Sequence, residues 1–186
     1  PESLQAYRIA RSRYIYENLF LYQLVTQWNR AQLCHEAGDS SVAETDLTPF
    51  LEKLPFELTE GQKSAVRDIQ QDLSSSRPMN RLVQGDVGCG KTAVAETALY
   101  RVAAAGGQCA FMAPTEILAR QHREKLSKDF EPLGIRCVLL ISALSAPEKK
   151  KVLQEIREGT ADVVVGTHAI IQENVIFQNL ELVITD

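Results

Sequence analysis

The stretch that decides the fold is Gly85-Asp86-Val87-Gly88-Cys89-Gly90-Lys91-Thr92, which has the spacing Gly-x-x-x-x-Gly-Lys-Thr. The short apolar segment before it, Arg81 to Gln84, is typical of a buried strand, and the segment after it, Lys91 to Ala105, is typical of a helix. Glycines allow a tight turn in which successive N–H groups converge on phosphates at a helix N-terminus. In this setting Lys91 is expected to bind the β- and γ-phosphates, and the Thr92 hydroxyl to bind Mg²⁺. The pattern therefore predicts a site for a nucleoside triphosphate.

Length and composition restrict the class of protein. The 186 residues suffice for one domain with a hydrophobic core and an added segment, and the net charge of −4 provides no general basic field for DNA. The sequence lacks a signal-peptide pattern and an apolar run long enough to cross a membrane, so no membrane partner is expected. It begins with Pro1, which indicates a fragment. Four cysteines without metal-binding spacing favour reduced thiols in the cytoplasm: Cys34, Cys89, Cys109 and Cys137.

The N-terminal third is predicted to be one long helix. Ser3 can cap a helix that runs from Leu4 to Ala37 and ends at Gly38. Heptad spacing of large apolar side chains favours packing on a neighbouring domain, at Tyr7, Tyr14, Leu21 and Trp28. A basic patch in its first half leaves open a contact with nucleic acid, through Arg8, Arg11 and Arg13. Residues 39–53 are expected to be a linker with a short helical turn at Thr48-Pro49.

From residue 54 onward, strands alternate with helices. The predicted helices are Glu60 to Leu73, Lys91 to Ala105, Glu116 to Phe130 and Pro147 to Glu158. The predicted strands are Arg81 to Gln84, Gln108 to Met112, Arg136 to Ile141, Asp162 to Val165 and Leu180 to Thr185. Apolar runs such as Val163 to Val165 suit parallel strands that are buried on both faces. The expected fold is therefore α/β: a RecA-like P-loop NTPase domain with a mainly parallel sheet, preceded by a long N-terminal helix.

Three further segments are candidate binding sites. Gln62 has an amide that can both donate to and accept from an adenine edge, yet Thr59-x-x-Gln62 is also a capping box, and both roles can hold together. Pro114-Thr115 follows a predicted strand, where Thr115 is either a plain helix cap or a contact for a DNA phosphate. Gly166-Thr167-His168 follows another strand end and offers backbone, hydroxyl and imidazole groups.

Several motifs together resemble the bacterial RecG DNA helicases. They are Phe56 to Gln62, Pro78 to Gly88, Ala113 to Gln121 and Gly166 to Gln172. The resemblance implies an ATP-dependent DNA helicase of superfamily two, with ATP and Mg²⁺ as cofactors. It implies that Phe56, Gln62 and residues 85–92 bind the nucleotide, that Lys91 and Asp186 are catalytic, and that Thr92 and Asp186 hold Mg²⁺. The implied DNA contacts are Pro114, Thr115, Gly166, Thr167 and His168.

The resemblance also implies a domain organisation. Residues 1–38 would be the helix that connects a branch-binding wedge domain to the motor, 39–53 a linker, and 54–186 the first motor domain, truncated at its C-terminus. Asp186 would begin the Asp-Glu-x-His box. A second motor domain and the wedge domain are then expected in cis, in a cytoplasmic monomer that acts on branched, forked or duplex DNA. The fragment alone is expected to bind nucleotide without efficient hydrolysis.

Two departures from the RecG pattern and two alternative functions stay open. Cys89 stands where the family has Ser, which predicts a reactive thiol beside Lys91. Ile141-Ser142 stands where the family has a Thr-Gly pair that contacts DNA.

The alternatives are a duplex-DNA translocase of the transcription-repair coupling factor type and a non-enzymatic, truncated nucleotide-binding fragment. RNA helicases of the DEAD-box type fit less well, because their usual Thr-Gly-Ser-Gly-Lys-Thr and Pro-Thr-Arg-Glu-Leu motifs do not occur here.

Overall fold

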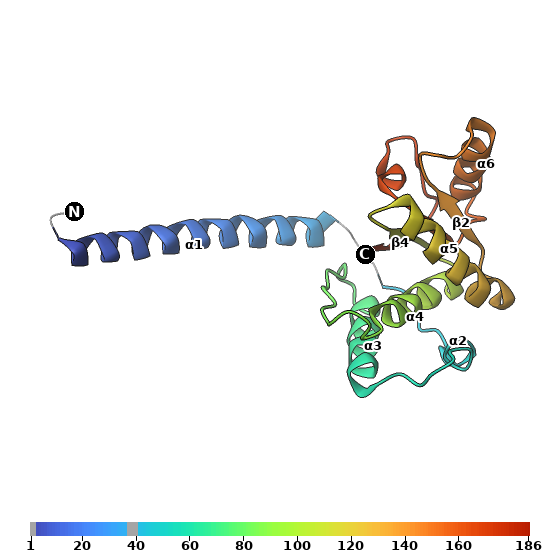
Figure 1. The fold of residues 1–186 in the computed structure, drawn as a ribbon, viewed down its shortest axis with the longest axis horizontal. Coiled ribbons are helices and arrows are strands. Elements are labelled where there is room, and N and C mark those ends of the chain that lie inside the picture. Colours follow the sequence, from blue (N-terminus) through green and yellow to red (C-terminus); the bar gives the residue numbers. More distant parts are fainter. Residues whose placement is uncertain (1–2, 37–40) are drawn as a thin grey trace. The chain divides into compact units, whose positions relative to one another are not determined.

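The computed structural model describes residues 3–36 and 41–186 (Figure 1). It divides into two units, of which one contains the N-terminal helix and the other contains residues 41–75 and 79–186. Within the described residues, no helix is both long and apolar enough to span a bilayer.

The first unit is built around helix α1, Leu4–Glu36. The Ser3 hydroxyl accepts a hydrogen bond from the Ala6 N–H at 3.1 Å, so the predicted cap is confirmed. The predicted end at Ala37 and Gly38 lies outside the described residues. Apolar side chains are not confined to one stripe: Tyr16 follows Tyr7 by two and a half helical turns, and both are exposed.

The second unit contains a parallel four-stranded sheet in the order β2-β3-β1-β4. Its strands are β1 (Gln108–Met112), β2 (Cys137–Leu140), β3 (Val163–Gly166) and β4 (Leu180–Thr185). In register, Ala110 pairs with Val164 on one side and with Val183 on the other. The predicted strands 136–141 and 162–165 differ from the observed ones only at their ends.

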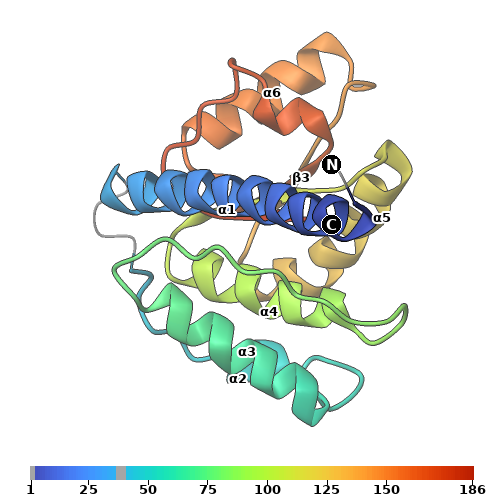
Figure 2. The same ribbon diagram turned by 90° about the vertical axis from the view of Figure 1, so that its left-hand side faces the viewer.

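Helices cover both faces of this sheet. They are α2 (Thr48–Leu51), α3 (Glu60–Leu73), α4 (Lys91–Ala104), α5 (Glu116–Phe130) and α6 (Ala146–Arg157), with short 3₁₀ turns at Glu131–Leu133 and His168–Ile171. One face, with Phe111 and Val165, packs with α3, α4 and α5, whereas the opposite face, with Ala110 and Val164, packs with Ile156 of α6. Figure 2 shows α3 beside α4, with α6 at the opposite end of the domain. This layering confirms the predicted α/β class.

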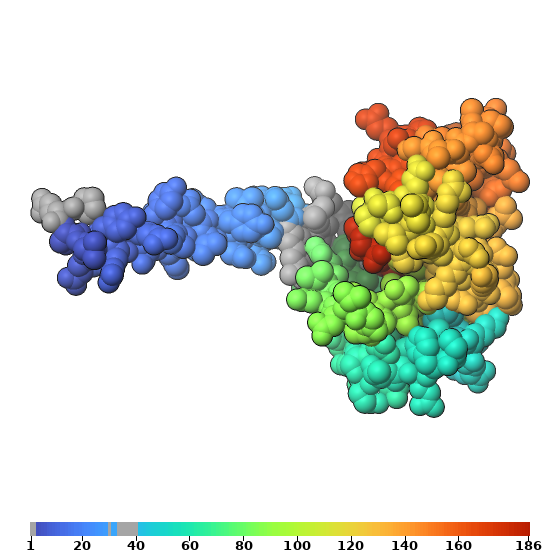
Figure 3. Space-filling model, in the orientation of Figure 1, coloured from blue at the N-terminus to red at the C-terminus, as the bar shows by residue number. Residues whose placement is uncertain are grey.

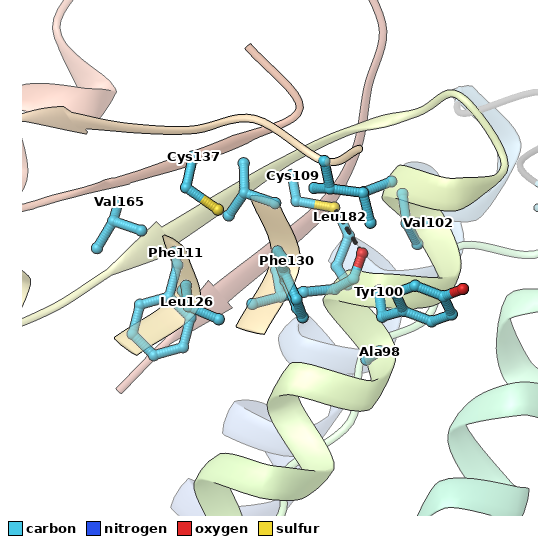
Figure 4. Close-up of a cluster of buried hydrophobic side chains, with 14 of the residues drawn as sticks. Ala98, Tyr100, Val102, Cys109, Phe111, Leu126, Phe130, Cys137, Val165 and Leu182 are labelled. Atoms are coloured by element: carbon cyan, nitrogen blue, oxygen red, sulfur yellow. Dashed lines mark hydrogen bonds between the residues drawn. The ribbon is translucent and has the colours of Figure 1, made fainter. Parts of the chain in front are cut away.

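The larger core lies between the sheet and α4 and α5 (Figure 4). Phe50 of α2 is fully buried, and its ring centroid lies 5.3 Å from that of Tyr100 and 5.5 Å from that of Phe130. Aromatic pairs at these separations add about 0.5–1.5 kcal/mol to the free energy of burial. Residues 41–53 therefore contribute a central side chain to the packed unit.

A buried arginine connects the start of this unit to two helices. Arg101 of α4 is 1% exposed, and burial lowers the pKa of its guanidinium. Its Nη2 donates to the Val42 carbonyl at 3.0 Å and to the Ser74 hydroxyl at 2.7 Å. Its Nη1 donates to the Gln70 carbonyl at 2.7 Å. Arg101 thus holds together α4, the end of α3 and the segment around residue 42.

The predicted strand at Arg81 to Gln84 is wrong, because this segment has no strand pairing in the structure. A strand requires a neighbour that completes its hydrogen bonds. The nearest sheet edge is β4, and a pocket of about 370 Å³ lies between the two segments, lined by Val83 on one side and Val183 on the other. The segment therefore runs along the sheet as irregular backbone, with Leu82 86% exposed.

Candidate active site

The glycine-rich loop leads directly into α4. Gly88 and Gly90 have φ angles of +80° and +81°, which L-residues with a side chain rarely adopt, and Gly90 is the N-cap of α4. A Cβ on Gly90 would also collide with the side-chain amide of Gln62. The positive φ is therefore the reason for glycine at position 90, since the end of the Gln62 side chain could move away from a Cβ.

Lys91 bends back over the loop from the first turn of α4. Its Nζ donates to the carbonyls of Gly85 at 2.8 Å and Asp86 at 2.9 Å, and it lies 3.9 Å from the Cys89 sulfur. An ammonium group has three donors, so a phosphate at this position would compete with these acceptors. The Lys91 ammonium group, which is predicted to bind phosphate, therefore lies against the loop that is expected to surround the phosphates.

Asp186 lies at the end of β4, opposite the start of α4. It lines the same pocket of about 370 Å³ as Lys91 and Thr92. In Figure 3 the red atoms of the C-terminal strand are visible between the green loop and α4 region and the yellow α5 region. The Asp186 N–H donates to the Met112 carbonyl at 2.9 Å, which fixes its backbone to β1.

The donors in this pocket suit Mg²⁺. The Thr92 hydroxyl and the Asp186 carboxylate supply hard oxygen atoms. Residues 3–36 and 41–186 contain no group of three or more His, Cys, Asp or Glu side chains that could hold a metal. Mg²⁺ typically binds through one or two carboxylates together with substrate phosphates rather than in a cage made of protein alone. The residues present therefore fit an ion that is shared with a nucleotide.

Gln62 connects α3 to the loop. The capping box is confirmed, because the Gln62 N–H donates to the Thr59 hydroxyl at 3.3 Å and the Thr59 N–H donates to Gln62 Oε1 at 2.8 Å. Gln62 Nε2 also donates to the Cys89 carbonyl at 2.9 Å. Both ends of the amide are therefore used within the protein, and an adenine contact would have to exchange with one of these bonds.

The structure separates the two residues outside the glycine-rich loop that are predicted to bind the nucleotide. Gln62 and Lys91 line a pocket of about 280 Å³, whereas Phe56 lines a different pocket of about 690 Å³ beside Lys63. Phe56 is half-exposed, and it is available as an apolar surface there.

The predicted DNA contacts meet at one edge of the sheet. Pro114 and Thr115 follow β1, and Gly166 to His168 include the end of the adjacent β3, so that the Ala113 N–H donates to the Gly166 carbonyl at 2.8 Å. Thr115 caps α5, because its hydroxyl accepts from the Leu118 N–H at 3.3 Å. Pro114, Thr115 and His168 are exposed. The structure thus brings together segments that are about fifty residues apart.

The loop that contains the departure at Ile141-Ser142 is fixed on two sides. Ile141 is fully buried, and the Ala143 N–H donates to the Glu116 carboxylate at 3.2 Å. The loop is therefore held by apolar packing and by α5.

The cysteines fall into two groups. Cys89 is exposed in the glycine-rich loop, whereas Cys109 and Cys137 are buried in the core. Burial raises the pKa of the Cys137 thiol to about 12, and it raises that of Cys109 as well. Among these three thiols, only Cys89 is accessible to reagents. The side chain of Cys34 lies outside the described residues.

Sequence reasoning missed a polar cluster next to the pocket. His122 Nε2 lies 3.1 Å from Asp186 Oδ2, and Lys125 forms an ion pair with Glu96. Glu96 is 1% exposed, and its burial raises its pKa, while the nearby Lys125 acts in the opposite direction. The sequence held one signal, namely a charged residue in the stretch Ala93–Ala98 of α4, whose other side chains are small and uncharged.

Comparisons with known proteins agree with this architecture. A family model described as DEAD/DEAH box helicase matches residues 59–186. The ATP-dependent DNA helicase RecG of Bacillus subtilis is 44% identical over 188 residues, covering 100% of this chain and 28% of the relative. RecG of Thermotoga maritima is 46% identical over 187 residues, covering 100% of this chain and 24% of the relative.

A solved structure is similar as well. The structure of RecG bound to a three-way DNA junction matches with a TM-score of 0.85 and 45% identity, over 94% of this chain and 24% of that one. The predicted resemblance to RecG is therefore confirmed, and the chain spans about a quarter of the length of these relatives.

Proposed function

The chain belongs to the DEAD/DEAH box helicase family, and we propose that it forms the first, ATP-binding motor domain of a RecG-type DNA helicase. The observation that carries this proposal is the single pocket that joins Lys91 and Thr92 of the glycine-rich loop to Asp186 of β4. A P-loop NTPase site needs these three groups on one side of the triphosphate.

The residues have distinct roles in this proposal. The loop N–H groups and the N-terminus of α4 bind the phosphates, and Lys91 exchanges its two carbonyl acceptors for phosphate oxygens. Thr92 and Asp186 hold Mg²⁺. Bound there, the ion would supply positive charge to offset the negative charge that develops during phosphoryl transfer. Gln62 connects this loop to α3, where nucleotide binding at the loop can be transmitted to the adjacent helix.

DNA is the proposed substrate, bound at the edge formed after β1 and β3. A hydroxyl that accepts one hydrogen bond can still donate its proton, so Thr115 is able to cap α5 and bind a phosphate. The exposed His168 and the half-buried Thr167 stand on the neighbouring segment. Branched DNA is favoured over plain duplex because the similar RecG structure is bound to a three-way junction.

The domain alone is proposed to bind ATP without efficient turnover. The relatives are about four times as long, and we expect a second motor domain and a wedge domain in cis. An arginine finger from a second domain contributes about 10³-fold or more to the rate of phosphoryl transfer. Helix α1 is proposed to connect the motor to the wedge domain.

Binding of a fluorescent ATP analogue with Mg²⁺ tests the proposal. Wild-type chain is compared with Lys91→Ala and with Lys128→Ala, which removes an equivalent charge from an exposed position on α5. Saturable binding that Lys91→Ala abolishes and Lys128→Ala preserves is expected. A folded wild-type chain that does not bind the analogue, or binds it equally well without Lys91, would refute the proposed site.

A further inference from the structure

The strongest unassigned feature is the contact between His122 and Asp186. His122 lies on α5, and its side chain is 16% exposed, while that of Asp186 is 47% exposed. The two residues are 64 positions apart, and only the fold brings His122 Nε2 to 3.1 Å from Asp186 Oδ2. An ionised carboxylate only accepts hydrogen bonds, so the imidazole N–H is the donor.

The imidazole is itself held in place. Its ring centroid lies 4.8 Å from that of Phe111, a side chain of β1 that is 2% exposed. This packing restricts the ring to one orientation against the core. Met112, the next residue of β1, also accepts a hydrogen bond from the Asp186 N–H. Side chain and backbone of Asp186 are therefore both fixed to the same part of the domain.

Helix α5 is in turn fixed to the helix that carries the glycine-rich loop. Lys125, one turn after His122, forms an ion pair with the buried Glu96. Glu96 lies one turn after Thr92 on α4. Helix α5 is thus joined through Lys125 to the helix that carries Thr92, and through His122 to Asp186. Both proposed Mg²⁺ ligands line the pocket of about 370 Å³.

We propose that His122 is a positioning residue that orients the Asp186 carboxylate for Mg²⁺. The hydrogen bond from the imidazole to Asp186 Oδ2 restricts rotation of the carboxylate and leaves its remaining lone pairs to the ion. This inference rests on the proposed nucleotide site and adds to it a residue outside the quoted RecG motifs.

The test is a Mg²⁺ titration of fluorescent ATP-analogue binding to the whole 186-residue chain. In His122→Phe the ring packing is kept and the donor is lost, whereas His122→Gln restores a donor at the distance of Nε2. His122→Asn places its amide about one bond short and serves as a second variant without the contact. Lys128→Ala is the matched control on the exposed side of α5.

We expect His122→Phe and His122→Asn to raise the half-saturating Mg²⁺ concentration by about tenfold, the lower end of the effect of losing such an outer partner of a metal ligand. His122→Gln and Lys128→Ala should remain close to wild type. Analogue binding measured in EDTA should be equal in all variants, because the imidazole acts through the carboxylate and the ion.

Two outcomes overturn the inference. The first is an unchanged Mg²⁺ titration in both variants without the donor. The second is an equal loss of binding with and without Mg²⁺, which would make His122 a purely structural residue. Lys91→Ala separates these outcomes from failure of the proposed site, because it should abolish binding even if His122 proves irrelevant.

Discussion

Replacing Arg101 by Met tests how the segment around Val42 is joined to α3 and α4. The substitution keeps a long, flexible, apolar side chain but removes the guanidinium. It leaves four acceptors without this donor: the Val42 carbonyl, the Gln70 carbonyl, Gln70 Oε1 and the Ser74 hydroxyl. The Ser74 side chain is exposed, and the Gln70 carbonyl keeps its hydrogen bond from the Ser74 N–H, so the loss falls mainly on the Val42 carbonyl and Gln70 Oε1. Each of these costs about 1–3 kcal/mol when it loses its donor. The sum is a loss of about 3 kcal/mol, because relief from burying the charge offsets the extra strength of charged hydrogen bonds.

Thermal unfolding followed by circular dichroism measures this loss. For a chain of this size 1 kcal/mol shifts Tm by about 2–4 °C, so Arg101→Met should unfold about 6–12 °C below wild type. Arg136→Met is the matched control, since it removes an exposed guanidinium that pairs with Glu155, a contact worth less than about 1 kcal/mol. If Arg101→Met destabilises the chain no more than Arg136→Met does, the buried hydrogen bonds do not hold this segment.

Three further predictions concern the loop and α4. Alkylation of the exposed Cys89 should block analogue binding, and bound nucleotide should slow the labelling, as measured by mass spectrometry; equal labelling rates would contradict this. Gly90→Ala should weaken binding, because it strains the loop that surrounds the phosphates and displaces the Gln62 amide from the Cys89 carbonyl, whereas Gly134→Ala, with φ +81° and open space, should lose only about 1–2 kcal/mol of stability and still bind. The raised pKa of Glu96 means that the native state retains its proton at higher pH than the unfolded chain. In urea titrations, the unfolding free energy of wild type should therefore fall relative to that of Glu96→Gln as the pH rises above about 4.5. A relative rise would show that the ion pair with Lys125 outweighs burial.

Local signals account for what could be predicted. The glycine-rich loop depends on consecutive residues, and the structure has glycine at the positive φ angles of positions 88 and 90. The capping box of α3 is likewise a pattern within four residues. Alternating apolar strands and capped helices predicted most elements to within a residue or two, because burial on both faces of a parallel sheet leaves a strong local pattern.

The error at Arg81 to Gln84 has the opposite cause. An apolar segment of four residues has strand propensity, but a strand forms only against a neighbouring strand. Here a pocket lies between the segment and β4, so the propensity is not realised. Tertiary surroundings also decided the hydrogen-bond partners of Gln62, whose amide could equally have been left for adenine.

The class of fold, the phosphate loop and the order of the motifs could be read from the chain alone, because each depends on residues that are neighbours in the chain. Tertiary packing was needed to bring His122 to Asp186, Lys125 to the buried Glu96 and Arg101 to Val42. These pairs are 64, 29 and 59 residues apart. Their contacts arise from the order of parallel strands and the packing of α4 and α5 on one face of the sheet, which no local pattern records.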